Sequence, residues 1–117
     1  MPNVINAARA YEAAANHRSP RAQEADVFRR ATGALRAARD ANEDSRTRNH
    51  ALSDNRRLWL AVNDLMRDPL NALPLKLRAS IVSVGLAVQR EMERDSPDFD
   101  FLIAINENIA AGLSAAD

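Results

Sequence analysis

LPLKLRASIVSVGLAVQREM, residues 73–92, is the most continuously apolar stretch of an otherwise highly charged chain. At about 100° per residue, its apolar side chains fall on two stripes on roughly opposite sides of a predicted helix. The first stripe contains Leu77, Ile81, Val84, Val88 and Met92, and the second contains Leu75, Ala79, Val82 and Leu86. A helix that is apolar on two sides is either enclosed within a bundle or keeps one side for another chain. The pattern supports both alternatives equally.

Helical periodicity and helix-start signals extend to most of the remaining chain. Ser19-Pro20 and Ser96-Pro97 each place a serine N-cap before a proline at the first helical position. The predicted main helices are Pro20–Asn42, Arg46–Arg67, Pro74–Arg94 and Pro97–Leu113. A weaker, alanine-rich helix is predicted over residues 3–17, and no strand pattern competes with these segments. We therefore expect an all-α fold, a small bundle formed by residues 1–117 as a single domain.

Each flanking helix has an apolar arc that we expect to face the core. In the first main helix the arc contains Val27, Phe28, Ala31, Leu35 and Ala38, and Gly33 is expected to mark close packing. In the second it contains Leu52, Leu58, Trp59, Val62, Leu65 and Met66, with Leu60 about a third of a turn outside it. In the last it contains Phe101, Leu102, Ile105, Ile109 and Leu113.

Composition and charge exclude several classes of protein. Lys+Arg and Asp+Glu balance at 16 each, which gives no overall field to attract nucleic acid or an anionic membrane. The chain has no cysteine, so disulfides and thiolate chemistry are excluded. The sequence contains neither a secretory signal pattern nor an apolar run long enough for a membrane span. We therefore expect a cytoplasmic protein that binds no membrane and no nucleic acid directly.

The residue types that carry catalysis are present without the spacing that catalysis requires. His17 and His50 lie in different segments and form no metal-binding motif. Paired carboxylates such as Asp98 and Asp100 lie near helix starts, where the helix dipole accounts for them. No nucleophile elbow or phosphate-binding loop occurs. We expect no enzymatic activity, no metal and no cofactor.

A dense run of polar residues precedes the only tryptophan of the chain. The segment DNRRLW contains Asp54, Asn55, Arg56, Arg57 and Trp59. The run is consistent with a cluster of salt bridges and hydrogen bonds that anchors the bundle, or with a ligand site. We favour the structural interpretation of these residues.

Five short motifs occur along the chain: DNRRLW at 54–59, N-x-L-P-x-x-L-R-A-S-I at 71–81, R-A-Y at 9–11, S-P-R at 19–21, and I-N with a later G-L at 105–106 and 112–113. Taken together, these motifs resemble those of the FlaF family of flagellar biosynthesis regulators. The resemblance covers nearly the whole chain in order, and the pairing of the first two motifs is specific. Asn71 and Arg78 of the second motif join the run of 54–59 as structural anchors or an alternative partner site.

The resemblance implies a non-enzymatic cytoplasmic protein that is required for normal flagellin production. Such a protein would bind flagellin as a secretion chaperone or adaptor, with the regulator FlbT as a further partner. The alternative is a post-transcriptional regulator of flagellin messenger RNA, acting on the RNA or through FlbT. Flagellin ends are amphipathic and disordered before assembly, so an apolar groove would suit them. The expected partner-binding residues are Leu60, Leu75, Ala79, Val82 and Leu86.

Overall fold

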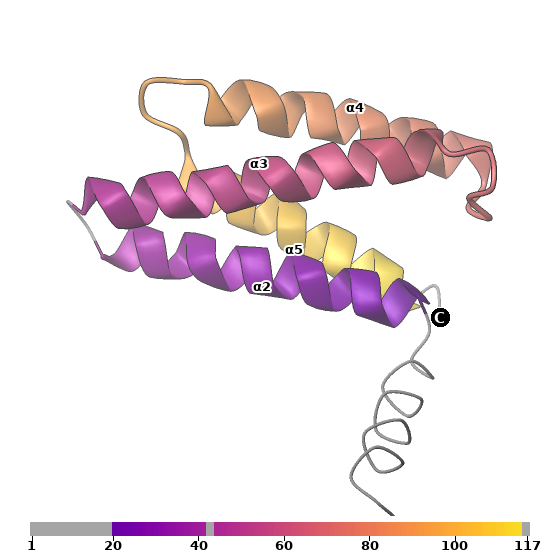
Figure 1. Cartoon of the computed structure of the whole chain (residues 1–117), viewed down its shortest axis with the longest axis horizontal. Coiled ribbons are helices and arrows are strands. Elements are labelled where there is room, and N and C mark those ends of the chain that lie inside the picture. Colours follow the sequence, from indigo (N-terminus) through magenta and orange to yellow (C-terminus); the bar gives the residue numbers. More distant parts are fainter. Residues whose placement is uncertain (1–19, 42–43, 116–117) are drawn as a thin grey trace, which may run out of the picture.

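The computed structural model describes residues 20–41 and 44–115, which form four α-helices (Figure 1). They are α2 (Pro20–Asp40), α3 (Ser45–Arg67), α4 (Leu75–Met92) and α5 (Phe99–Ala115). No strand occurs within these ranges, so the predicted all-α bundle of four main helices is confirmed. The helix predicted over residues 3–17 lies outside the described residues.

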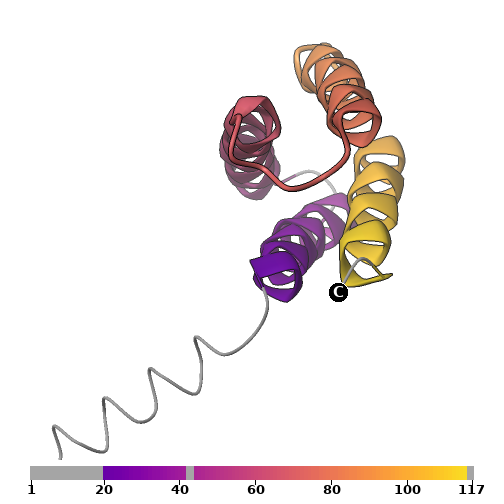
Figure 2. The ribbon, with the colours of Figure 1, turned by 90° about the vertical axis from the view of Figure 1, so that its right-hand side faces the viewer.

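The four helices contribute unequally to the bundle. The most extensive packing is between α2 and α5, and α3 packs against both α2 and α4. In contrast, α4 touches α5 only slightly, so it is held almost entirely by α3. Figure 2 shows this arrangement end on, with α4 beside α3 at the edge of the bundle. One long side of α4 therefore has no helix against it among the described residues.

The core follows the predicted arcs at most positions, but some expected residues are exposed and several residues outside the arcs are buried. Val27, Leu65 and Phe101 were expected in the core but are exposed, and Leu77 of the first stripe of α4 is exposed as well. The buried face of α5 is turned towards Phe99, Leu102, Ile103, Asn106, Ala110 and Leu113. The predicted arc of this helix contained apolar residues only and therefore omitted Asn106. Because Asn106 is buried, the buried face of α5 is rotated away from Phe101.

Capping side chains mark the starts of α3 and α5. Asp44 is the N-cap of α3 and accepts hydrogen bonds from the backbone N–H groups of Arg46 and Thr47. At α5, Asp98 accepts from the N–H of Phe101, so this helix begins two residues after the predicted Pro97. Both ends of α4 also lie slightly inside the predicted range, because Pro74 is the N-cap residue and Glu93 is the C-cap.

Glycine allows one close approach between helices. A Cβ atom added to Gly85 on α4 would lie 3.1 Å from Cε3 of Trp59 on α3. A Cβ at Gly33 would meet nothing within 4 Å, so the expected close packing at that position is wrong. Gly85 is therefore the position where the absence of a side chain lets α4 rest on the tryptophan.

The cap of α3 predicts a specific dependence of stability on pH. Hydrogen bonds lower the pKa of Asp44. The largest effect comes from the hydroxyl of Thr47, and the backbone N–H groups of Thr47 and Arg46 add to it. A carboxyl whose pKa is lower in the folded state stabilises that state above its unfolded pKa and loses the effect as pH falls through the folded value. At pH 7, the urea concentration at the unfolding midpoint should therefore be higher for the wild-type protein than for Asp44→Asn. This difference between the two midpoints should shrink below about pH 4. A difference that stays constant with pH would contradict this role.

The contact at Gly85 predicts opposite effects for two glycine substitutions. Gly85→Ala should destabilise the protein by about 1–2 kcal/mol, because the methyl group presses on a buried ring and strain exceeds the gain in helix propensity. Gly33→Ala is the matched control, and should stabilise by up to about 1 kcal/mol because the space around it is open. Urea unfolding measures both. Equal stabilisation by the two substitutions would show that α4 does not rest on Trp59.

Candidate binding site between α3 and α4

Trp59 lies at the centre of the bundle and makes directional contacts with two other helices. Its side chain is 4% exposed. Its indole Nε1–H donates a hydrogen bond to Oδ1 of Asn106 on α5 at 3.0 Å. Its ring meets the ring of Phe28 on α2 edge to face, with 5.6 Å between centroids. Trp59 therefore ties α3 to both α2 and α5.

Two buried asparagines extend this contact towards α4. Nδ2 of Asn106 donates to Oδ1 of Asn55 at 2.8 Å, and Nδ2 of Asn55 lies 3.4 Å from Sδ of Met92. Both asparagine side chains are completely buried. Buried amides are tolerated only when they are hydrogen bonded, so each of these side chains depends on the neighbouring one for a hydrogen-bond partner. We call Asn55, Trp59, Asn106 and Met92 the buried polar chain.

The connection from α3 to α4 is held by two further motif residues. Nδ2 of Asn71 donates to the carbonyl of Leu65 at 2.8 Å, and its Oδ1 accepts from the N–H of Leu73 at 3.0 Å. The guanidinium of Arg78 donates to the carbonyls of Leu73, Met66 and Asp68. Arg78 therefore satisfies carbonyls at the end of α3 that have no partner within the helix.

The run from 54 to 59 separates into an inner and an outer set. Asn55 and Trp59 point into the core and reach other helices. Asp54 and Arg57 are exposed and form a 3.4 Å ion pair with each other along α3. Arg56 is exposed and lies at the edge of a groove. Hydrogen bonds to other helices thus come from Asn55 and Trp59, whereas the ion pair stays within α3.

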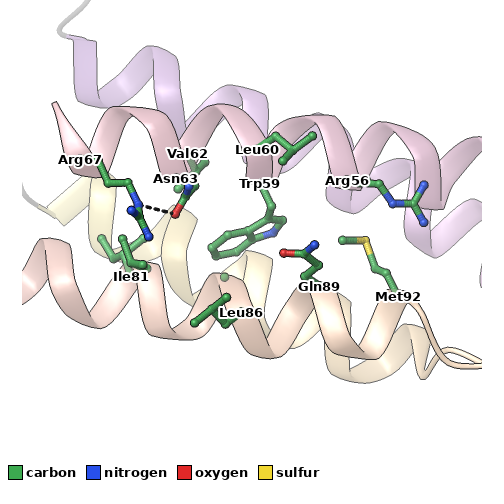
Figure 3. A pocket seen from close by; sticks show the side chains of 12 residues that line it. Arg56, Trp59, Leu60, Val62, Asn63, Arg67, Ile81, Leu86, Gln89 and Met92 are labelled. Carbon is green, nitrogen blue, oxygen red and sulfur yellow. Dashed lines mark hydrogen bonds between the residues drawn. The ribbon is translucent and has the colours of Figure 1, made fainter.

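An apolar groove of about 280 Å³ runs between α3 and α4, over the outer side of Trp59 (Figure 3). Ile81, Val82 and Gly85 line it from α4. Two leucines at its margin are unusually open for their type, with Leu60 57% exposed and Leu86 51% exposed. We call this surface the α3–α4 groove. It presents apolar area on a rigid, buried support, as sites for peptide helices do.

The groove brings together some of the residues expected to bind a partner. Leu60, Val82 and Leu86 all line it. Leu75 and Ala79 are exposed nearer the start of α4 and do not line it. Val82 is half-buried and packs on the core as well. Among the described residues, Leu75 and Leu86 of the second stripe are exposed, whereas Val82 of the same stripe also contributes to the core.

Sequence reasoning missed four groove residues, Gly85, Asn63, Arg67 and Gln89. The signal for Gly85 was available, because a glycine inside a well-formed helix commonly marks the close approach of another group. Arg67 and Gln89 carried no such signal, since polar residues on an exposed helix face are usual. The two arginines of the groove lie at its opposite ends in Figure 3, with Trp59 between them.

A second apolar opening of about 180 Å³ lies near the start of α2. All four helices contribute to it, and its margin includes the exposed Val27 and Leu65. Glu24 is the only charged residue that lines it. The two openings therefore differ in character, because the α3–α4 groove carries positive charge and this one does not.

The described ranges show neither a metal-binding cluster nor a helix suited to spanning a membrane. Within them, no three acidic or histidine side chains gather as they would around a metal ion. Among the helices of residues 20–41 and 44–115, none combines the length and apolar character needed to cross a bilayer.

The buried polar chain predicts large but different costs for two substitutions of Trp59. Trp59→Ala should lower the free energy of unfolding by about 3–5 kcal/mol, because it leaves a cavity in the core. Trp59→Phe keeps an aromatic ring but leaves Asn106 without its donor, at a cost of about 1–3 kcal/mol. Both are measured by urea unfolding followed by circular dichroism. A loss below about 1 kcal/mol for Trp59→Ala would place the indole outside the core.

Comparison with known proteins agrees with the motif resemblance. The model of a family described as flagellar protein FlaF matches residues 7–113. The match spans α2, α3 and α4 and nearly all of α5, including the buried polar chain. No curated protein and no solved structure shows significant similarity to the chain. On the extent of the family match, the chain belongs to the FlaF family of flagellar proteins.

Proposed function

We propose that this flagellar protein binds flagellin in the α3–α4 groove, as a cytoplasmic secretion chaperone or adaptor. The observation that supports the proposal is the pair of exposed leucines, Leu60 and Leu86, beside the buried Trp59. Large apolar side chains that stay half-exposed around a hollow typically mark a site for another molecule. Within the FlaF family, flagellin is the partner that the resemblance implies.

The shape of the groove suits an amphipathic helix. Two antiparallel helices form its walls, and the apolar residues between them recur at helical spacing, as Ile81, Val82, Gly85 and Leu86 do on α4. A partner helix laid between them would place its own apolar stripe against the two exposed leucines, above the buried Trp59. A flagellin end that is disordered before export would gain order there and would hide its apolar stripe from other chains.

The support beneath the groove is suited to binding without rearrangement. Trp59 is fixed by its hydrogen bond to Asn106, and the start of α4 is fixed by the bonds of Arg78 to the end of α3. A pre-organised surface binds more tightly because little order must be gained on binding. The family motifs therefore build the support, and the exposed leucines provide the contact surface.

The alternative of direct binding to messenger RNA has less support in this geometry. Trp59 is buried and thus cannot stack on a base. Many arginines of the described residues also face carboxylates: Arg36 binds Glu107, Arg39 binds Asp40 and Asp100, and Arg94 binds Glu91. An effect on flagellin production through FlbT remains compatible with the groove, because FlbT is itself a protein partner.

Acidic substitutions at the groove margin test the proposal. Leu60→Asp combined with Leu86→Asp should weaken flagellin binding by about tenfold to 100-fold, since two half-exposed leucines no longer contribute apolar burial. Isothermal titration of purified flagellin into the purified protein measures the effect. Both positions are exposed, so helicity and cooperative unfolding should be retained. Val82 is left unchanged because it also packs on the core.

Leu70→Asp is the matched control, since this leucine is 91% exposed and lies outside the groove. It should bind flagellin as wild type does. If the double variant folds and binds flagellin normally, the groove is not the site. If wild type binds RNA in a salt-sensitive manner and does not bind flagellin, the alternative function is correct.

A further inference from the structure

We propose that the α3–α4 groove selects a helix that carries a carboxylate at each end of its apolar stripe, with Arg56 and Arg67 as the groups that recognise the two acids. The proposal rests on the proposed function for the presence of a helical ligand and adds the charge pattern of that ligand. It therefore defines which amphipathic helices the groove accepts and in which position they bind.

The first observation is that these two arginines lack acidic partners. Of the residues that the structure describes, no carboxylate lies within 4.0 Å of the guanidinium of Arg56 or Arg67, and Arg67 donates only to Oδ1 of Asn63, at 3.3 Å. Other arginines of the described residues do have acidic partners, as the ion pairs of Arg29, Arg36 and Arg39 show. The α3–α4 groove also has no aspartate or glutamate among its lining residues. Its positive charge is therefore left uncompensated beside an apolar surface.

The second observation is the position of the two arginines. Figure 3 shows Arg67 at one end of the groove and Arg56 at the other, with Trp59 between them. Both belong to α3, where a separation of about 11 residues corresponds to roughly 16 Å and three helical turns. A ligand helix lying along the groove has the same rise per residue. Its two acids would therefore lie about 11 residues apart on one face.

The chemistry of the groups fits this assignment. The guanidinium fork matches the two oxygens of a carboxylate, so each end of the ligand would be held by a directional contact. Both arginines are at an exposed margin, where charge mainly affects the association rate, the register and the salt dependence of binding. Apolar contact with Leu60 and Leu86 would provide the affinity, and the two acids would fix the position of the ligand along the groove.

The second apolar opening, near the start of α2, would not select a ligand with acidic ends. Its lining residues include Glu24 but no arginine or lysine. A ligand with acidic ends would find no opposite charge there, and a ligand without them would find apolar surface in both openings. A preference for acidic ends therefore distinguishes the α3–α4 groove from the second opening.

The test uses flagellin and two synthetic helical peptides that share one leucine stripe. One peptide carries glutamate at two positions 11 residues apart, and the other carries lysine at the same positions. Fluorescence anisotropy of labelled peptides in 50 mM and 200 mM salt measures binding to the full-length protein. Wild type should prefer the glutamate peptide by about fivefold in low salt, and the preference should shrink in high salt.

Charge reversal at both arginines should invert this preference. Arg56→Glu combined with Arg67→Glu should favour the lysine peptide and bind flagellin more weakly than wild type does. The matched control is Arg30→Glu combined with Arg46→Glu, which changes the net charge equally at exposed positions outside both openings. This control should keep the wild-type preference.

The outcomes separate the two proposals. If wild type binds flagellin but shows no preference between the peptides, the charge selection is wrong and the proposed function stands. If the control variant loses the preference as fully as the Arg56 and Arg67 variant, overall charge is responsible and the assignment to these two residues is wrong. If wild type binds neither flagellin nor either peptide, both proposals fail.

Discussion

The hydrogen bond from the indole of Trp59 to Asn106, continued by Asn106 to Asn55, is the constraint on which the rest of the structure depends. Apolar ridges on alanine-rich helices can slide past one another at little cost, whereas a buried amide without a partner is costly. The observed register of α3 against α5 satisfies all three side chains. The buried polar chain therefore selects one alignment among the many that apolar packing would allow.

The same constraint explains how an open groove persists on a small bundle. Because Asn106 holds the indole from one side, the other side of the ring is a fixed surface on which α4 rests at Gly85. Arg78 fixes the start of α4 through carbonyls at the end of α3, so the helix needs little support from α5. The space beside this contact remains open, and Leu60 and Leu86 stay exposed along it.

The sequence was sufficient for the helices but not for their orientation. Helix boundaries came within a few residues because prolines and capping side chains act locally. The inward faces depended on partners far along the chain, and periodicity placed Phe101 in the core although Asn106 is buried instead. Nothing near Asn106 indicates that it must accept a hydrogen bond from a tryptophan 47 positions earlier. Similarly, Val27, Leu65 and Leu77 have helical spacing typical of core residues, but the described helices leave each of them 43–46% exposed.

The candidate site was partly predictable for the same reason. Leu60, Val82 and Leu86 could be identified because they lie outside the main apolar stripe of their own helix, and this is visible from the sequence of one helix. That Leu75 does not line the groove depends instead on where α4 meets Trp59. Arg56 was singled out with the run of 54–59, but Arg67 was hidden by the balance of charge along the chain. An arginine that will pair with an acid and one that will not look alike in a sequence. Only the folded arrangement shows that Arg36 and Arg39 face carboxylates across the bundle, whereas no acidic residue is among the described residues that line the groove, so the pairing of an arginine is a property of tertiary structure.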